Sequence, residues 1–338
     1  MNFYLIGIDY KTVADDVREL AYAGRKEIEL FVRSVSWGQA SVLFTCSRVE
    51  LYGISRDGRE SLNIFLKIKK AFPDVFSGAY FKNENLETSR HAFRLACGLE
   101  SLVPFERQIL EQLSLWIEQE NFPERLYELW SKVLRESVFV RADSGIDTVQ
   151  KDIADLLIDD IRTRIGSLRG KKILVVGTGK VADIVSRKAW QGAVLYFAAR
   201  RKNARAQDLA RRAKAGLIPF DGLSQHLKNA DAVITATSSP HYVLEPAGLH
   251  RFLQERERIL YIYDLAFPRD VHPQVRRLPG VEVLDMKSLA ELLNGRRAGL
   301  KKYFEKAESL IQGILREQIG VGYVEKHQNR YQAEPALI

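Results

Sequence analysis

Short apolar runs and amphipathic stretches alternate along the first part of the chain. Residues 3–8 and 42–44 are continuous apolar runs with the length and side-chain character of buried strands. Residues 25–35 and 62–71 carry apolar side chains at helical spacing. This alternation predicts a small α/β domain, to which we assign residues 1–148.

A second pattern begins at residue 149. An amphipathic helix over 149–165 leads into a series of short apolar runs, at 172–176, 194–199, 232–236, 259–263 and 281–284. Strands separated by helical segments are typical of a doubly wound parallel sheet, so we predict a Rossmann-like domain over 149–287. Helical spacing from residue 288 to about 319 predicts one long amphipathic helix in a C-terminal segment, 288–338.

Composition and charge narrow the class of protein. Lys and Arg number 51 against 43 Asp and Glu, so the net charge is +8, which permits a polyanionic partner without requiring one. No apolar run is long enough for a membrane span, and the N-terminus lacks the features of a signal peptide. We therefore expect a cytoplasmic protein with no membrane contact. Two cysteines without neighbouring metal-binding residues argue against a disulfide framework and against a metal site.

Cys46 is the first candidate for chemistry. It follows the apolar run at 42–44 and lies two residues before Arg48. A guanidinium beside a thiol favours the nucleophilic thiolate. Burial as a small apolar residue is an equally good interpretation of these few residues. Cys97 lies in a helical apolar pattern over 90–103, interrupted by Gly98, and is expected to be buried.

The strongest motif in the chain is the Gly-x-Gly-x-x-Ala pattern Gly177-Thr178-Gly179-Lys180-Val181-Ala182. It lies between an apolar run and a helical segment. Gly177 allows a tight turn, Gly179 lets the backbone approach a pyrophosphate, and Ala182 lets the helix pack closely on the strand. The pattern favours dinucleotide binding over a merely structural turn. Arg200 and Arg201 end the next predicted strand, where an NAD enzyme would offer a carboxylate, so we predict NADPH as the cofactor. A solvated basic face is the alternative.

Several segments together resemble glutamyl-tRNA reductase. Thr45-Cys46-Ser47-Arg48, followed by Glu50 and Tyr52, is similar to the cysteine segment of that family, and residues 264–270 are similar to its Asp-Leu-Ala-x-Pro-Arg-Asp segment. A third stretch matches at His91, Arg94, Ala96, Gly98, Leu99, Ser101, Leu102, Val103, Glu106, Gln108, Ile109, Leu110 and Gln112. Phe105 and Arg107 depart from the family pattern, which has glycine and proline there, so a bulkier and more basic pocket loop is expected.

The resemblance implies a reaction and a site. Cys46 would attack the ester that joins glutamate to tRNA, and hydride from NADPH would release glutamate 1-semialdehyde, the first step of 5-aminolevulinate and haem synthesis. His91 would assist proton handling, although by itself it fits a surface or capping residue. Glu106 would pair with the substrate ammonium and Arg48 with its γ-carboxylate. The substrate-binding set implied by position is Thr45, Ser47, Arg48, Ser101, Glu106, Arg107, Gln108 and Gln112.

Partners and alternatives follow from the same comparison. The implied partners are glutamyl-tRNA, a second copy of the chain through the C-terminal helix, and an aminomutase that receives the product. The sequence ends at Ile338, so we expect a shortened dimerisation region and a weaker dimer. A divergent NADP-dependent dehydrogenase of the shikimate type and a non-catalytic tRNA-binding relic remain open. The first would need a lysine and aspartate pair rather than Cys46.

Overall fold

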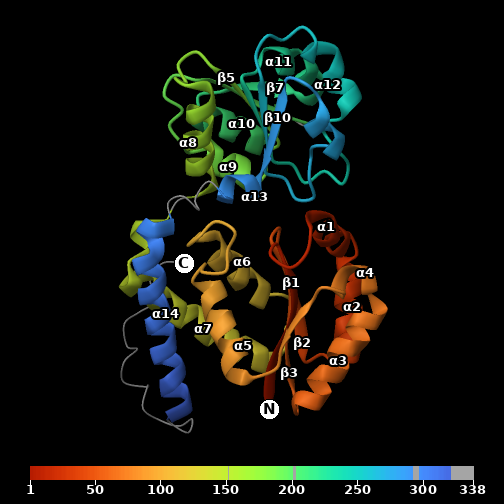
Figure 1. Cartoon of the computed structure of the whole chain (residues 1–338), viewed down its shortest axis with the longest axis vertical. Helices are drawn as coiled ribbons and strands as arrows, with labels where there is room; N and C mark the ends of the chain where they lie inside the picture. The colour runs from red at the N-terminus through yellow and green to blue at the C-terminus, as the bar shows by residue number, and fades with distance from the viewer. Residues whose placement is uncertain (151, 201–202, 292–296, 321–338) are drawn as a thin grey trace.

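The computed structural model places two α/β domains one above the other, with a long C-terminal helix beside the first (Figure 1). It describes residues 1–150, 152–200, 203–291 and 297–320. Among these residues, no helix combines the length and apolarity that crossing a bilayer would require.

The first domain is built on a four-stranded antiparallel sheet with the order β2-β3-β1-β4. The strands are β1 (Asn2–Asp9), β2 (Ala40–Phe44), β3 (Arg48–Ser55) and β4 (Tyr80–Lys82). The helices are α1 (Asp15–Ala23), α2 (Arg25–Val35), α3 (Gly58–Ala71), α4 (Pro73–Phe76), α5 (Asn85–Ala96), α6 (Gln108–Ile117) and α7 (Glu124–Ser144), followed by the short η1 (Ile146–Thr148).

Both faces of this sheet are covered, which explains why β1 is apolar throughout. Tyr4 and Ile6 point into a core shared with α1 to α4, whereas Phe3 and Leu5 point into a core shared with α5, α6 and α7. Successive side chains of a strand face opposite sides of a sheet, so a strand buried on both sides needs no polar alternation. The predicted α/β fold of the first part of the chain is confirmed.

The second domain is a six-stranded parallel sheet with the order β7-β6-β5-β8-β9-β10, which confirms the predicted doubly wound fold. Its strands are β5 (Lys172–Val176), β6 (Val194–Ala199), β7 (Gly216–Pro219), β8 (Ala232–Thr235), β9 (Leu260–Asp264) and β10 (Val281–Asp285). Its helices are α8 (Ile153–Ile165), α9 (Lys180–Ser186), α10 (Ala204–Arg212), α11 (Leu223–Asn229), α12 (Pro246–Leu253) and α13 (Met286–Glu291), with η2 (Phe220–Gly222) and η3 (Pro273–Arg277). From β5 the sheet extends through β6 and β7 on one side and through β8, β9 and β10 on the other. Ligands of such sheets bind at this change in strand order, between β5 and β8.

Three sequence predictions need correction. The short edge strand β7 was not predicted, because it offers only four residues of signal. The helix expected across 90–103 ends at Ala96, because Gly98 adopts a left-handed conformation that stops it. The single tail helix is described as two, α13 and α14 (Arg297–Gly320), on either side of residues 292–296, which lie outside the described residues.

The two tail helices pack on different domains. α13 contacts α8 of the parallel-sheet domain, whereas α14 contacts α5 and α7 of the first domain. Figure 1 shows α14 running along the side of the first domain. Ala307, Ile311 and Leu315 of α14 are buried in that domain's core. α14 therefore completes the core of the first domain, whereas α13 packs on the second.

Candidate active site

Cys46 lies at the tip of the β2–β3 connection, with an exposed side chain. The loop is tight, because the Thr45 amide donates to the Arg48 carbonyl at 3.0 Å and the Tyr10 amide donates to the Ser47 carbonyl at 2.9 Å. Arg18 of α1 donates through Nη1 to the carbonyl of Cys46 itself. The predicted position of the thiol at a strand end is confirmed.

The thiol faces a cleft between the two domains. From the first domain the cleft is lined by Cys46 and Arg18, and from the second by Asp264, Phe267 and Arg269, which follow β9. The candidate nucleophile and the ends of strands of the parallel sheet therefore line the same cleft. This juxtaposition could not be read from either domain alone.

Three contacts hold α1 against the second domain at this cleft. Glu19 Oε1 accepts from the Arg269 amide and from Arg269 Nε, each at 2.8 Å. Tyr22 packs edge-on against Phe267 at 5.4 Å, and the Arg18 guanidinium lies 5.9 Å from the same ring. Sequence reasoning missed the roles of Arg18 and Glu19, because a charged pair on an amphipathic helix ordinarily faces solvent.

The electrostatics of Cys46 differ from the sequence prediction. Loss of hydration among the surrounding protein atoms raises the pKa of Cys46 to about 11, and the charge of Glu106 adds to this. Arg18 and Arg48 lower the pKa, but by less. The side chain is itself solvent-exposed, so crowding around the loop rather than enclosure of the sulfur causes the shift. Arg48 favours the thiolate, as predicted, but burial and the charge of Glu106 outweigh it, so the thiol is the resting form.

Alkylation by iodoacetamide should report this raised pKa. Because only the thiolate reacts, the rate at Cys46 is expected to rise about tenfold per pH unit from pH 7 to 10, without a plateau. The rate is measured by mass spectrometry of the Cys46 peptide, with Cys46→Ser as the background for buried Cys97. A plateau near pH 7 would show a low-pKa thiol instead.

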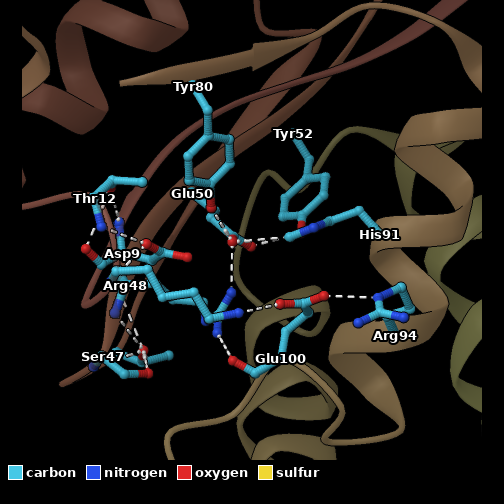
Figure 2. Close-up of polar contacts among 12 residues, drawn as sticks. Asp9, Thr12, Ser47, Arg48, Glu50, Tyr52, Tyr80, His91, Arg94 and Glu100 are labelled. Carbon is cyan, nitrogen blue, oxygen red and sulfur yellow. Dashed lines mark hydrogen bonds and ion pairs between the residues drawn. The ribbon is translucent and has the colours of Figure 1, made fainter. Parts of the chain in front are cut away.

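Behind the cysteine loop lies a buried network centred on Glu50, shown in Figure 2. Its carboxylate accepts from Arg48 Nη1 at 2.7 Å and from the Tyr52 hydroxyl at 2.6 Å, and the Tyr80 hydroxyl also donates to it. His91 Nε2 lies 3.0 Å from Glu50 Oε1. Burial alone would raise the pKa of Glu50, but the Arg48 guanidinium and His91 hold that pKa well below its usual range.

This network changes the roles expected for Arg48 and His91. Arg48 is fully buried, and its Nη2 donates to the carbonyl of Glu100. A guanidinium without exposed surface cannot receive a substrate carboxylate as the pocket stands, so the predicted pairing of Arg48 with the γ-carboxylate is wrong for this structure. His91 is buried rather than a surface or capping residue, and it contacts a carboxylate. Its part in proton handling stays a prediction.

Thr45 and Ser47 hold the cysteine loop. The Thr45 hydroxyl accepts from the amides of Ser47 at 3.3 Å and Arg48 at 3.2 Å, and both side chains are buried. These contacts follow from the short connection between β2 and β3, in which side-chain oxygens substitute for missing backbone partners. Direct contact of either residue with substrate stays a prediction.

The pocket loop, residues 97–107, joins α5 to α6 and carries the other predicted substrate contacts. The Ser101 hydroxyl is buried and has no hydrogen-bond partner among the described residues, although it lies near enough to Glu106 to favour that residue's charged form. Burial raises the pKa of the half-buried Glu106, against smaller opposing effects of Ser101, Arg48 and Lys180. An incompletely compensated carboxylate and an unpaired hydroxyl are groups that a polar ligand could satisfy.

The other predicted substrate contacts, at positions 107, 108 and 112, differ in solvent exposure. Arg107 is exposed, immediately before α6, whereas Gln108 and Gln112 are half-buried and one helical turn apart, so they share a face of α6. The sequence predicted that Phe105 makes the pocket wall bulkier, and this prediction is wrong. Its ring is fully buried against α14, 4.5 Å from Phe304.

The glycine motif has the expected geometry for a dinucleotide. Gly177 has φ of 112°, and a Cβ placed there would lie 2.5 Å from the Ala236 carbonyl oxygen, so only glycine fits. Gly179 directly precedes α9, Thr178 lies between the two glycines, and Ala182 is fully buried against the sheet. A tight glycine turn followed by a closely packed helix fits the binding of a dinucleotide cofactor.

The side chains around the motif are already placed by protein contacts. Arg200, just after β6, donates to the Ser239 hydroxyl at 3.0 Å and lies 5.6 Å from the Phe220 ring. Lys180 pairs with Glu111 of α6 at 2.7 Å, and Val181 packs on the domain core. Arg201 lies outside the described residues.

Comparisons with known proteins agree with this geometry. A model of the glutamyl-tRNA reductase N-terminal domain matches residues 6–140, and a model of shikimate and quinate 5-dehydrogenases matches residues 160–292. Glutamyl-tRNA reductase from Trichlorobacter lovleyi is 29% identical over 325 residues, which cover 92% of this chain and 75% of that protein. The enzyme from Archaeoglobus fulgidus is 28% identical, over 94% of this chain and 73% of that one. The chain is therefore similar to glutamyl-tRNA reductases over most of its length.

A solved structure of glutamyl-tRNA reductase from Methanopyrus kandleri is 26% identical, with a TM-score of 0.48, and covers 93% of this chain and 79% of that one. The match of residues 160–292 to shikimate and quinate 5-dehydrogenases fits a nicotinamide cofactor. The resemblance first seen in the cysteine segment and in residues 90–112 therefore extends over most of the chain.

Proposed function

We propose that this chain reduces glutamyl-tRNA to glutamate 1-semialdehyde with NADPH, through a thioester on Cys46. One observation carries the proposal: an exposed thiol and the strand ends of a nucleotide-binding sheet line the same cleft. Similarity to glutamyl-tRNA reductases over most of the chain indicates the substrate class. The product places the reaction at the first step of 5-aminolevulinate synthesis.

In the first chemical step the Cys46 thiolate attacks the ester carbonyl of the glutamyl group. The carbon–oxygen bond to the tRNA breaks, the tRNA leaves with its 3′-terminal oxygen, and the glutamyl group remains as a thioester. A thioester accepts hydride more readily than an ester, and the covalent bond keeps the acyl group in the cleft. NADPH, when bound, supplies the hydride that releases the aldehyde and returns the sulfur as thiolate.

Glu106 has two uses in this scheme. Its carboxylate can pair with the α-ammonium of the glutamyl group. The ammonium would compensate the negative charge that burial of Glu106 destabilises. The same pairing removes part of the negative field that raises the pKa of the Cys46 thiol. Substrate binding would thereby favour the thiolate when it is needed. Ser101, Gln108 and Gln112 would hydrogen-bond the rest of the glutamyl group.

Arg18 and His91 act around the sulfur in different ways. Arg18 fixes the cysteine loop through the Cys46 carbonyl and contributes positive charge beside the sulfur. His91 reaches the site through the Glu50 network and is proposed to handle a proton at the thioester stage. The exposed Arg107 and the net charge of +8 suit the polyanionic tRNA.

The direct test measures NADPH oxidation by the full chain. Turnover is expected with glutamyl-tRNA and not with uncharged tRNA or shikimate. Reduction of NADP⁺ with shikimate, in which the shikimate alcohol is oxidised, would favour the dehydrogenase alternative. Binding of tRNA without oxidation of NADPH would favour a non-catalytic relic.

The preference for NADPH should depend on Arg200. Arg200→Ala is expected to raise the KM for NADPH roughly tenfold or more while leaving the KM for NADH nearly unchanged, because a charged hydrogen bond to the 2′-phosphate is lost. Steady-state assays with both cofactors measure the effect. Arg211→Ala, on the exposed face of α10, is the matched control. Equal loss with both cofactors would remove Arg200 from this role.

A further inference from the structure

Helix α14 contacts the pocket loop through an unusual residue. Phe105 has φ of 66°, in the left-handed region that residues with a side chain rarely adopt. Its ring has no exposed surface and lies 4.5 Å from the ring of Phe304 on α14. A backbone conformation of this kind persists only where surrounding contacts determine it.

The backbone around Phe105 is tightly closed. The Phe105 amide donates to the Gly98 carbonyl at 3.0 Å, and a Cβ added to Gly98 would lie 3.0 Å from the Phe105 Cα. Buried Arg141 of α7 donates to the carbonyls of Cys97, at 2.9 Å, and Phe105, at 2.8 Å. The loop is therefore tied at both ends, and Ser101 and Glu106 are carried on the tied segment.

A second connection joins α14 to the same loop by charge. Glu308 pairs with Arg94 of α5 and accepts from Arg90 Nε at 2.6 Å. Arg94 Nε in turn donates to Glu100 at 2.7 Å. Glu100 directly precedes Ser101, and its carbonyl accepts from Arg48. Phe304 and Glu308 are one helical turn apart on α14. Phe304 reaches the loop beside Glu106, and Glu308 reaches it beside Ser101 through Arg94.

We propose that α14 is a positioning element of the substrate pocket, with Phe304 and Glu308 as positioning residues that hold the pocket loop. The aromatic contact keeps Phe105 in its left-handed conformation, and the ion pairs fix Glu100. The identity of the substrate rests on the proposed function, but the conformation of the loop does not. α14 then does more than fill the core.

Phe304→Ala tests the proposal, with Ile311→Ala as the matched control. Ile311 is fully buried in the same core from the same helix, so both variants lose core packing. Only Phe304→Ala is expected to speed hydrogen exchange of amides 98–107, and to raise the KM for glutamyl-tRNA, each about tenfold, with kcat changed less than about twofold. Hydrogen exchange requires no activity, so it reports on the loop even if the proposed reaction is absent.

A second test measures the effect of Phe304→Ala in a Phe105→Gly background. Glycine adopts positive φ freely, so the loop of this variant should not need Phe304 to hold its backbone. Loss of Phe304 is therefore expected to change exchange and KM much less in the Phe105→Gly background than in the original chain. Equal effects of Phe304→Ala in both backgrounds, or equal exchange in the Ile311→Ala control, would overturn the proposal.

Discussion

Cys46→Ser is expected to abolish NADPH oxidation with glutamyl-tRNA, lowering kcat by at least about a thousandfold. A serine hydroxyl ionises far less readily than a thiol, and an ester on serine would be a poorer hydride acceptor than a thioester. The nucleotide-binding motif lies in the other domain, so the affinity for NADPH should not change. Single-turnover assays and a fluorescence titration with NADPH measure the two quantities.

Cys97→Ser is the control, because Cys97 is buried in the first domain's core and plays no part in the scheme. It should retain turnover. The original chain, mixed with charged tRNA in the absence of NADPH, should carry a glutamyl group on the Cys46 peptide by mass spectrometry. Turnover by Cys46→Ser, or the lack of that adduct, would contradict the thioester mechanism.

Glu50→Leu is expected to lower the free energy of unfolding by about 3–5 kcal/mol, because it leaves the buried Arg48 guanidinium uncompensated. The change also removes the acceptor of the Tyr52 hydroxyl and the partner of His91. Urea unfolding followed by circular dichroism measures the loss. The double variant Arg48→Met with Glu50→Leu should recover part of it, because no unpaired charge remains.

The same network predicts the direction of acid sensitivity. The pKa of Glu50 is held well below its value in an unfolded chain, roughly 4.3, so its contribution to stability is complete above that pH. The contribution is lost as the pH falls below that value, because the unfolded chain then binds a proton that the folded state binds only at lower pH. Stability of the original chain should therefore fall more steeply with acid than that of the double variant. Parallel curves would show that Glu50 does not bear this charge.

Much of the fold could be predicted because its signals are local. The apolar run of β1 and the Gly177 turn of the parallel sheet depend on residues close together in sequence. The boundary at Gly98 was misjudged, because helical spacing continues past a glycine whose left-handed conformation depends on the loop around it. Cys46 was found as a strand-end thiol, but its raised pKa depends on desolvation by the folded chain and on the charge of Glu106, sixty positions away.

The site could be predicted only in part. Ser101 and Glu106 were assigned by resemblance, and the structure places them on one tied loop. Arg48 was assigned to the substrate and lies instead in a buried ion pair, because sequence gives residue type but not the partner. Arg18, Glu19 and Arg141 were missed, since each acts through contacts made only after folding.

By itself the sequence determined the two α/β domains, the glycine turn and the candidate thiol, because backbone conformation and apolar periodicity are properties of neighbouring residues. Only the tertiary structure decided what faces the cleft, which charges are already paired, and how α14 holds Phe105. These depend on contacts between segments far apart in the chain, where distance and burial set the strength of each interaction.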